Sequence, residues 1–192
     1  MPSLVLASSS PYRRQLLERL NLPFEWAAPD IDETPLPGEA PEQLTLRLAE
    51  AKARALSERY PTHLIIGSDQ VLLLDGQPVS KPGNHANALE QLRRCSGKSI
   101  RFLTSLCLLD SASDTARSIV EPFEVVFRQL DEATIERYLL AEQPYDCAGS
   151  FKSEGLGISL FRALRGDDPN SLIGLPLIRL CDLLAEHGIQ IP

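Results

Sequence analysis

The sequence contains no long apolar segment. Its longest apolar runs, such as Val71–Leu74 and Leu106–Leu109, fall far short of the roughly 18 consecutive residues that a membrane-spanning helix needs. The N-terminal residues also lack the basic segment followed by a long apolar stretch that marks a signal peptide. We therefore expect a cytoplasmic protein without a membrane anchor, whose N-terminal residues form a strand.

Paired cysteines and clustered histidines are missing as well. The four cysteines, Cys95, Cys107, Cys147 and Cys181, are widely separated and form no Cys-x-x-Cys motif. Buried thiols are therefore expected, rather than a disulfide framework or a zinc site. The three histidines have no metal-ligand spacing, and we assign them no role.

Positive charge is in short supply. The chain has 19 basic and 26 acidic residues, a net charge of −7. This balance argues against binding to nucleic acid or to an anionic membrane, although it leaves room for a small basic pocket. The glycine-rich motifs of P-loop and dinucleotide-binding proteins are also absent.

What remains is typical of a globular protein. The 192 residues are 43% hydrophobic and 23% charged, so the chain can form a hydrophobic core that needs no disulfides or structural metal. No Gly/Ser-rich linker divides the chain. We expect a single domain over residues 1–192, with two lobes around a central cleft.

Apolar spacing and turn residues predict an α/β fold with a mixed, twisted β-sheet flanked by helices. The expected strands are Ser3–Ala7, Phe24–Ala28, His63–Gly67 continuing through Val71–Leu74, Ile100–Leu108, Phe123–Phe127 and Ile158–Leu164. The expected helices are one that begins at Pro11 after a Ser10 cap, Pro41–Tyr60, Asn84–Cys95, Asp131–Leu140 and Pro176–His187.

The first candidate site is the turn between the first strand and the first helix, Ser8–Arg14, called the serine turn below. Free backbone amides at a helix N-terminus and the hydroxyls of Ser8 and Ser10 can bind an anion. Arg13 and Arg14 add forked donors that suit phosphate oxygens. An ordinary serine cap beside two solvated arginines explains the same residues.

Carboxylates form the second candidate. Asp69 leaves a buried strand in the segment Gly67-Ser68-Asp69-Gln70, where it could hold a metal or take a proton from water. The simpler explanation is a turn aspartate before a hairpin. Asp30, Asp32 and Glu33 lie on a proline-rich loop; such clusters are usually solvated, but one that met Asp69 could hold Mg²⁺ against phosphates.

Two lysines and a glycine-rich segment complete the candidates. Lys52 lies on the long helix, whose buried face we expect to comprise Leu44, Leu48, Ala51 and Ala55; a surface lysine is the alternative. Lys81 precedes Pro82-Gly83 and could be a plain turn lysine. Glu154, in the irregular segment Asp146–Leu156, could accept hydrogen bonds from a base edge, or the segment could simply connect elements. Trp26 is expected in the core or at a sheet edge.

Together these segments resemble the Maf family of nucleotide pyrophosphatases. The resemblance lies in Leu6–Leu17, Asp30–Glu33, Ala51-Lys52-Ala53, Gly67–Gln70 and Lys81-Pro82, in the family's order, and runs on to the glycine-rich segment around Glu154. Each motif is weak alone, but the set covers nearly the whole chain.

The resemblance implies a cytoplasmic hydrolase that cuts a nucleoside triphosphate into the monophosphate and pyrophosphate, with a divalent metal (Mg²⁺, Mn²⁺ or Co²⁺) as cofactor. It implies Asp69 as the proton acceptor and Glu33 with Asp69 near the metal. The phosphate-binding positions that it implies are Ser8, Ser10, Arg13, Arg14, Lys52 and Lys81.

The resemblance also bears on the base. The aromatic Tyr12 and the carboxylate Glu154 resemble the subgroup that cleaves 7-methyl-GTP, whose methylated guanine is positively charged and suits an aromatic face and an acid. Gln70 is the third expected specificity position. A dTTP/UTP pyrophosphatase and a non-catalytic nucleotide-binding regulator of septum formation remain as alternatives, and a homodimer is possible.

Overall fold

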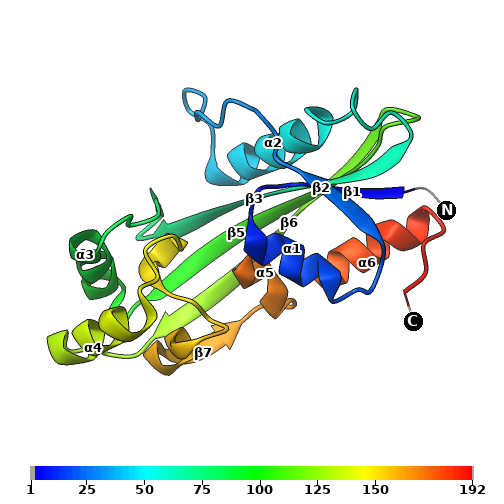
Figure 1. The fold of residues 1–192 in the computed structure, drawn as a ribbon. Helices are drawn as coiled ribbons and strands as arrows, with labels where there is room; N and C mark the ends of the chain where they lie inside the picture. Colours follow the sequence, from blue (N-terminus) through cyan, green and yellow to red (C-terminus); the bar gives the residue numbers. More distant parts are fainter. Residues whose placement is uncertain (1–2, 192) are drawn as a thin grey trace. The chain divides into compact units, whose positions relative to one another are not determined.

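The structure is a computed structural model that describes residues 3–191. Its strands form one seven-stranded sheet in the order β2-β1-β3-β5-β6-β7, with β4 paired to β3 (Figure 1). The strands are β1 Ser3–Ala7, β2 Phe24–Ala27, β3 His63–Leu74, β4 Gln77–Val79, β5 Ser99–Asp110, β6 Thr115–Phe127 and β7 Phe161–Arg165. β1 runs parallel to β2 and β3, whereas β4 and β7 pair antiparallel with β3 and β6, so the sheet is mixed.

Helices accompany this sheet, as expected for an α/β protein. They are α1 Pro11–Glu18, α2 Pro41–Arg54, α3 His85–Cys95, α4 Glu132–Glu142, α5 Pro169–Ile173 and α6 Leu177–Glu186, with 3-10 turns η1 Ala148–Ser150 and η2 Leu156–Leu160. The predicted fold class, a mixed sheet flanked by helices, is confirmed.

The chain divides into two compact units. Unit 1 comprises the described residues up to Gln70, Leu103–Glu121 and the described residues from Asp168 onward, and unit 2 comprises Val71–Phe102 and Pro122–Asp167. The single-domain assignment and the cleft stay predictions.

Both faces of the sheet in unit 1 are buried. Alternate residues of β1 serve the two faces: Leu4 and Leu6 pack with leucines of α1 and α6, and Val5 and Ala7 pack with α2. Figure 1 shows α2 on one side of these strands and α1 with α6 on the other. Parallel strands buried on both faces are continuously apolar, and β1 follows this rule after the exposed Ser3, since all residues from 4 to 7 are apolar and buried.

Unit 2 has an aromatic core of its own. Phe102, Phe127, Phe151 and Phe161 meet edge-to-face, with ring centroids 4.9–5.7 Å apart. Edge-to-face contacts suit the charge distribution of aromatic rings and add to the free energy of burial.

The predicted long helix is wrong in its end and in part of its buried face. α2 stops at Arg54, because the next residues form tighter turns, such as the bond from the Leu56 amide to the Ala53 carbonyl. Its buried residues are Thr45, Leu48, Ala49, Lys52 and Ala53. Of the predicted face, Leu48 is therefore buried, Leu44 and Ala51 are half-buried and Ala55 is exposed. Small residues are needed on the buried face, since a Cβ on Gly67 of β3 would lie 2.0 Å from the Ala49 carbonyl oxygen.

One further expectation needs correction, one helix was missed, and one pair of alternatives is decided. The predicted strand Ile158–Leu164 begins only at Phe161, because the preceding residues form the 3-10 turn η2. The short helix α5 was not predicted. Trp26 lies on the edge strand β2 as one alternative foresaw, but half of its surface is exposed, so it is not a core residue.

The remaining expectations on cysteine and membranes have clear outcomes. None of the four cysteines, all of which lie among the described residues, forms a disulfide. Cys95 and Cys107 are buried as expected, and burial raises the pKa of Cys95 to about 12 and of Cys107 to about 11; Cys147 and Cys181 are only partly buried. Within residues 3–191, no helix has the length and apolar character to cross a membrane.

Candidate functional site

The serine turn joins the end of β1 to α1, as predicted. Ser10 caps the helix by accepting a hydrogen bond from the Arg13 amide, and Pro11 occupies the first turn, where its missing N–H costs nothing. The Ser8 hydroxyl accepts a hydrogen bond from the Ser10 amide and is buried. The turn is therefore a built structure at the carboxyl end of a parallel strand, where α/β sheets bind ligands.

Lys52 lies between two predicted site carboxylates. Its Nζ is 2.7 Å from Asp69 Oδ1 and 2.9 Å from Glu33 Oε1. The side chains of Lys52 and Asp69 are 8% and 12% exposed, whereas Glu33 is 59% exposed. The alternative of a surface lysine is thus wrong, and Glu33 is the member of the acidic loop that joins Asp69.

Arg13 is fixed in the same unit by a backbone carbonyl. Its Nε donates to the Gly174 oxygen at 2.7 Å, and the buried Ser68 hydroxyl donates to the same oxygen at 3.0 Å. Burial lowers the pKa of the Arg13 guanidinium, while the negative charges of Asp69 and Glu33 act against that shift. Arg13 is therefore held within the field of both carboxylates by a bond that uses its Nε.

The side-chain amide of Gln70 is hydrogen-bonded to other protein groups, among them the backbone of α5. Its Nε2 donates to Thr104 Oγ1 at 2.9 Å and lies 2.9 and 3.2 Å from the Ser171 and Leu172 carbonyl oxygens of α5. Protein acceptors thus use its amide hydrogens, so a ligand would meet only its side-chain oxygen. Its predicted role in specificity stays a prediction.

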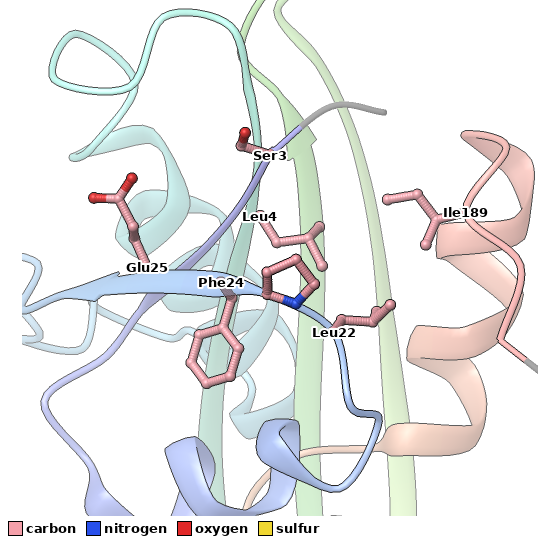
Figure 2. A pocket seen from close by; sticks show the side chains of 7 residues that line it. Ser3, Leu4, Leu22, Phe24, Glu25 and Ile189 are labelled. Atoms are coloured by element: carbon pink, nitrogen blue, oxygen red, sulfur yellow. The ribbon is translucent and has the colours of Figure 1, made fainter.

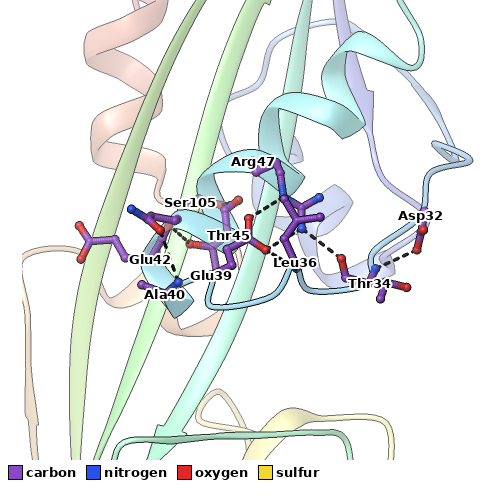
Figure 3. A network of polar contacts seen from close by, with 10 residues as sticks. Asp32, Thr34, Leu36, Glu39, Ala40, Glu42, Thr45, Arg47 and Ser105 are labelled. Carbon is purple, nitrogen blue, oxygen red and sulfur yellow. Dashed lines mark hydrogen bonds and ion pairs between the residues drawn. The ribbon is translucent and has the colours of Figure 1, made fainter.

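The loop that carries Glu33 is tied to α2 by Arg47 (Figure 3). Arg47 forms a bidentate pair with Glu39, with Nε–Oε1 and Nη2–Oε2 distances of 2.6 and 2.8 Å, and Nη2 also donates to the Thr34 carbonyl at 3.1 Å. The Asp32 carboxylate accepts from the Thr34 amide at 2.9 Å. These bonds hold the two residues on either side of Glu33.

Arg14 and Tyr12, the other predicted residues of α1, lie half-buried. The Arg14 guanidinium stacks on Trp26 of β2, 4.7 Å from the ring centroid. Such stacking orients a guanidinium without using its hydrogen-bond donors. Arg14 therefore keeps its donors while its position is restrained.

Lys81 and Glu154 belong to unit 2, and both are exposed. The backbone around Lys81 is held by α3, because Gln91 donates to the Ser80 carbonyl at 2.8 Å and Asn87 to the Pro82 carbonyl at 2.9 Å. Glu154 accepts a 3.3 Å hydrogen bond from Ser153. Whether these residues share a site with those of unit 1 stays a prediction.

An apolar pocket of about 320 Å³ also lies in unit 1. Figure 2 shows Leu4, Leu22, Phe24 and Ile189 around it, and Glu25 pointing away from Phe24. None of the predicted site residues lines this pocket, and it offers little polar chemistry. The polar cluster around Asp69 is therefore the candidate site.

A metal would have two protein carboxylates in this cluster. Glu33 and Asp69 both reach the Lys52 ammonium, so their oxygens face a common point. Among the described residues, no group of three His, Cys, Asp or Glu side chains could hold a metal. This donor set fits Mg²⁺ or Mn²⁺ shared with phosphate oxygens, since Mg²⁺ is commonly bound by one or two carboxylates and a substrate.

Sequence reasoning missed several residues that organise the site. Arg47 gave no local signal, because its partner Glu39 is eight residues away across a loop. The segment from Asp168 to Gly174 did carry a local signal. Asp168 stands before a proline and Gly174 follows two apolar residues, which is the pattern of a short capped helix. The Asp168 carboxylate indeed caps α5 by accepting from the Asn170 amide at 2.8 Å.

The fold and this cluster define an α/β protein with a cationic turn beside a buried carboxylate. The chain belongs to the Maf family, since the profile described as Maf-like protein matches residues 3–187. It is similar to proteins named 7-methyl-GTP pyrophosphatase from Pseudomonas aeruginosa (60% identity, 100% of both chains) and Nitrosococcus oceani (59%, covering 99% of this chain and 96% of the relative). The protein of that name from Pseudomonas syringae pathovar tomato is 59% identical over 100% of both chains.

A likeness to a solved structure is more distant. The Staphylococcus aureus Ham1 protein matches 66% of this chain and 72% of its own, with a TM-score of 0.48 and 14% identity.

Proposed function

We propose that this protein is a nucleoside triphosphate pyrophosphatase that hydrolyses 7-methyl-GTP to 7-methyl-GMP and pyrophosphate. The observation that carries the proposal is the meeting of Asp69 with the Lys52 ammonium inside unit 1, within the field of Arg13. A proton acceptor beside positively charged side chains is what attack of water on a phosphate requires. The names of the full-length relatives support the choice of nucleotide.

In the proposed reaction Asp69 orients a water molecule and takes its proton. The water oxygen bonds to the α-phosphorus while the bond from that atom to the α,β-bridging oxygen breaks, and pyrophosphate leaves with the bonding electrons. The serine turn, Arg13 and Lys52 hold the phosphates and balance their charge. Positioning and charge stabilisation of this kind supply most of the acceleration in phosphoryl transfer.

Glu33 and Asp69 are the residues proposed to hold a divalent metal, Mg²⁺, Mn²⁺ or Co²⁺. When bound, a divalent ion neutralises phosphate charge and polarises the phosphorus–oxygen bond. The chain's own contribution is to keep both carboxylates close together. Arg47 secures the loop of Glu33, and the β3 strand sets the position of Asp69.

Tyr12 and Glu154 are the residues proposed to select the base, and Gln70 has a share through its side-chain oxygen. A 7-methylguanine ring carries positive charge, which an aromatic face and a carboxylate both attract. The proposal further includes a cytoplasmic location and leaves a homodimer as a prediction.

A pyrophosphate-release assay over 7-methyl-GTP, GTP, dTTP and UTP tests the proposal, with Mg²⁺, Mn²⁺ and Co²⁺ in turn. We expect 7-methyl-GTP to have the highest kcat/KM. A preference for dTTP and UTP would overturn the choice of base, and nucleotide binding without pyrophosphate release in any metal would indicate a regulator instead of an enzyme.

A further inference from the structure

A single ammonium, that of Lys52, forms ion pairs with both carboxylates that are proposed to hold the metal. Its ammonium is 2.7 Å from Asp69 and 2.9 Å from Glu33, and its side chain is almost fully buried. At these distances the ammonium fills the space between the two carboxylate oxygens. A divalent ion bound to both would need the same space.

The charges of this cluster are already balanced. The negative charges of Glu33 and Asp69 are matched by the positive charges of Lys52 and Arg13, which interact with both acids. Binding a divalent ion would add two positive charges to a neutral group of side chains, and the described residues offer no third acidic, His or Cys ligand. In the protein without substrate, the cluster is therefore a poor metal site.

The two cations of the cluster differ in their freedom to move. Arg13 is anchored by its Nε bond to the Gly174 carbonyl. Within residues 3–191 Lys52 makes no such bond to the backbone, and its polar contacts there are the two carboxylates themselves. A lysine also has a flexible four-carbon stem with a compact charge at its end, so a small rotation moves the ammonium to a new partner.

We propose, building on the proposed function, that Lys52 is an exchangeable counter-ion. Triphosphate draws its ammonium away from Glu33 and Asp69, and these carboxylates are then open to the divalent ion that accompanies the nucleotide. The free protein binds that ion only weakly. By linkage, triphosphate and metal each strengthen the binding of the other through this one side chain.

Titration with Mn²⁺, followed by the electron paramagnetic resonance signal of the free ion, tests this in the absence of nucleotide. Because removal of Lys52 empties the space between the carboxylates, Lys52→Met should bind Mn²⁺ about 10-fold or more tightly than the wild type, within the usual range of coupling between sites. Lys98→Met is the matched control, since Lys98 pairs with Asp75 at an exposed position and should leave Mn²⁺ binding unchanged. Equal Mn²⁺ affinity in Lys52→Met and wild type overturns the proposal.

A second pair of variants keeps the test valid if Lys52→Met fails to fold. Glu33→Gln removes a carboxylate that holds Lys52, and Asp32→Asn removes the same charge next to it without touching Lys52. In metal-free calorimetry with inorganic tripolyphosphate, Glu33→Gln should tighten binding severalfold more than Asp32→Asn. Equal effects of the two variants contradict the exchange.

The outcomes also separate this inference from the proposed function. If the wild type binds no tripolyphosphate even with Mn²⁺, the proposed function itself fails. If it binds tripolyphosphate but the Lys52 and Glu33 variants behave like their controls, only the exchange of Lys52 is refuted.

Discussion

At the scale of single residues, the site depends on one buried ion pair and its neighbours. The pairing of Lys52 with Asp69 joins residues that are 17 positions apart, one on a helix and one on a strand. Sequence spacing marked both residues as candidates but could not say that they touch, because the contact depends on how α2 packs on β3. The same packing buries Lys52, although lysine side chains are usually exposed.

Asp69→Asn should abolish most of the turnover. The amide keeps the shape of the side chain but cannot accept the water proton, and loss of a general base typically costs about 10²–10⁴-fold in rate. The measurement is kcat for pyrophosphate release, with thermal unfolding as the check on folding. Wild-type kcat in a folded Asp69→Asn protein would remove Asp69 from its proposed role.

The Arg47–Glu39 pair makes the Glu33 loop sensitive to acid. The hydrogen bonds from Arg47 lower the pKa of Glu39 from 4.5 to about 2. A lowered pKa means that the pair stabilises the fold fully above the ordinary value of 4.5 and loses this contribution as the pH falls through about 2.

Glu39→Gln tests this directly. Its melting temperature should lie below that of the wild type at pH 6, and the two should converge as the pH falls from about 4.5 toward 2. A gap that is unchanged over this range would show that the Glu39 charge is not what holds the loop.

At the scale of elements, the sequence predicted the strands and helices with strong periodicity and clear caps. β1 and the Ser10 cap of α1 lie where expected. Besides the end of α2, the failures were short segments: α5 has only five residues, and η2 takes the place of the first three residues of a predicted strand. Such segments owe their form to tertiary contacts, because a few residues cannot show a period.

Gly174 illustrates how a missed element acts on the site. It ends α5 with a φ of +133°, which L side chains rarely adopt, and its carbonyl anchors Arg13. Gly174→Ala should cost roughly 1–3 kcal/mol of folding free energy from backbone strain and should rotate the carbonyl that holds Arg13. We expect a higher KM for the triphosphate and weaker pyrophosphate binding, with a smaller change in kcat.

Gly188→Ala is the matched control for this prediction. Gly188 also has a positive φ, +76°, but a Cβ there meets no atom within 4 Å. It should lose stability while its KM stays at the wild-type value. A KM that rises equally in both variants would attribute the effect to general destabilisation and not to Arg13.

At the scale of the whole molecule, composition and charge excluded some classes of protein, whereas the proposed function rests on the residues around Asp69. A shortage of basic residues argued against an extended nucleic-acid surface. Within unit 1, Lys52 contacts Asp69 directly and Arg13 lies in its field, whereas the predicted phosphate-binding Lys81 belongs to unit 2. The α/β class was predictable because it depends on repeated patterns along the chain. The contacts of individual side chains were not, because they join segments that the sequence keeps apart.

Hydrolysis of 7-methyl-GTP in H₂¹⁸O, with mass spectrometry of both products, tests the central claim most directly. Attack of water on the α-phosphorus predicts one ¹⁸O atom in 7-methyl-GMP and none in the released pyrophosphate. Label in pyrophosphate, release of inorganic phosphate in its place, or no hydrolysis under conditions where dTTP or UTP is cleaved would contradict the account.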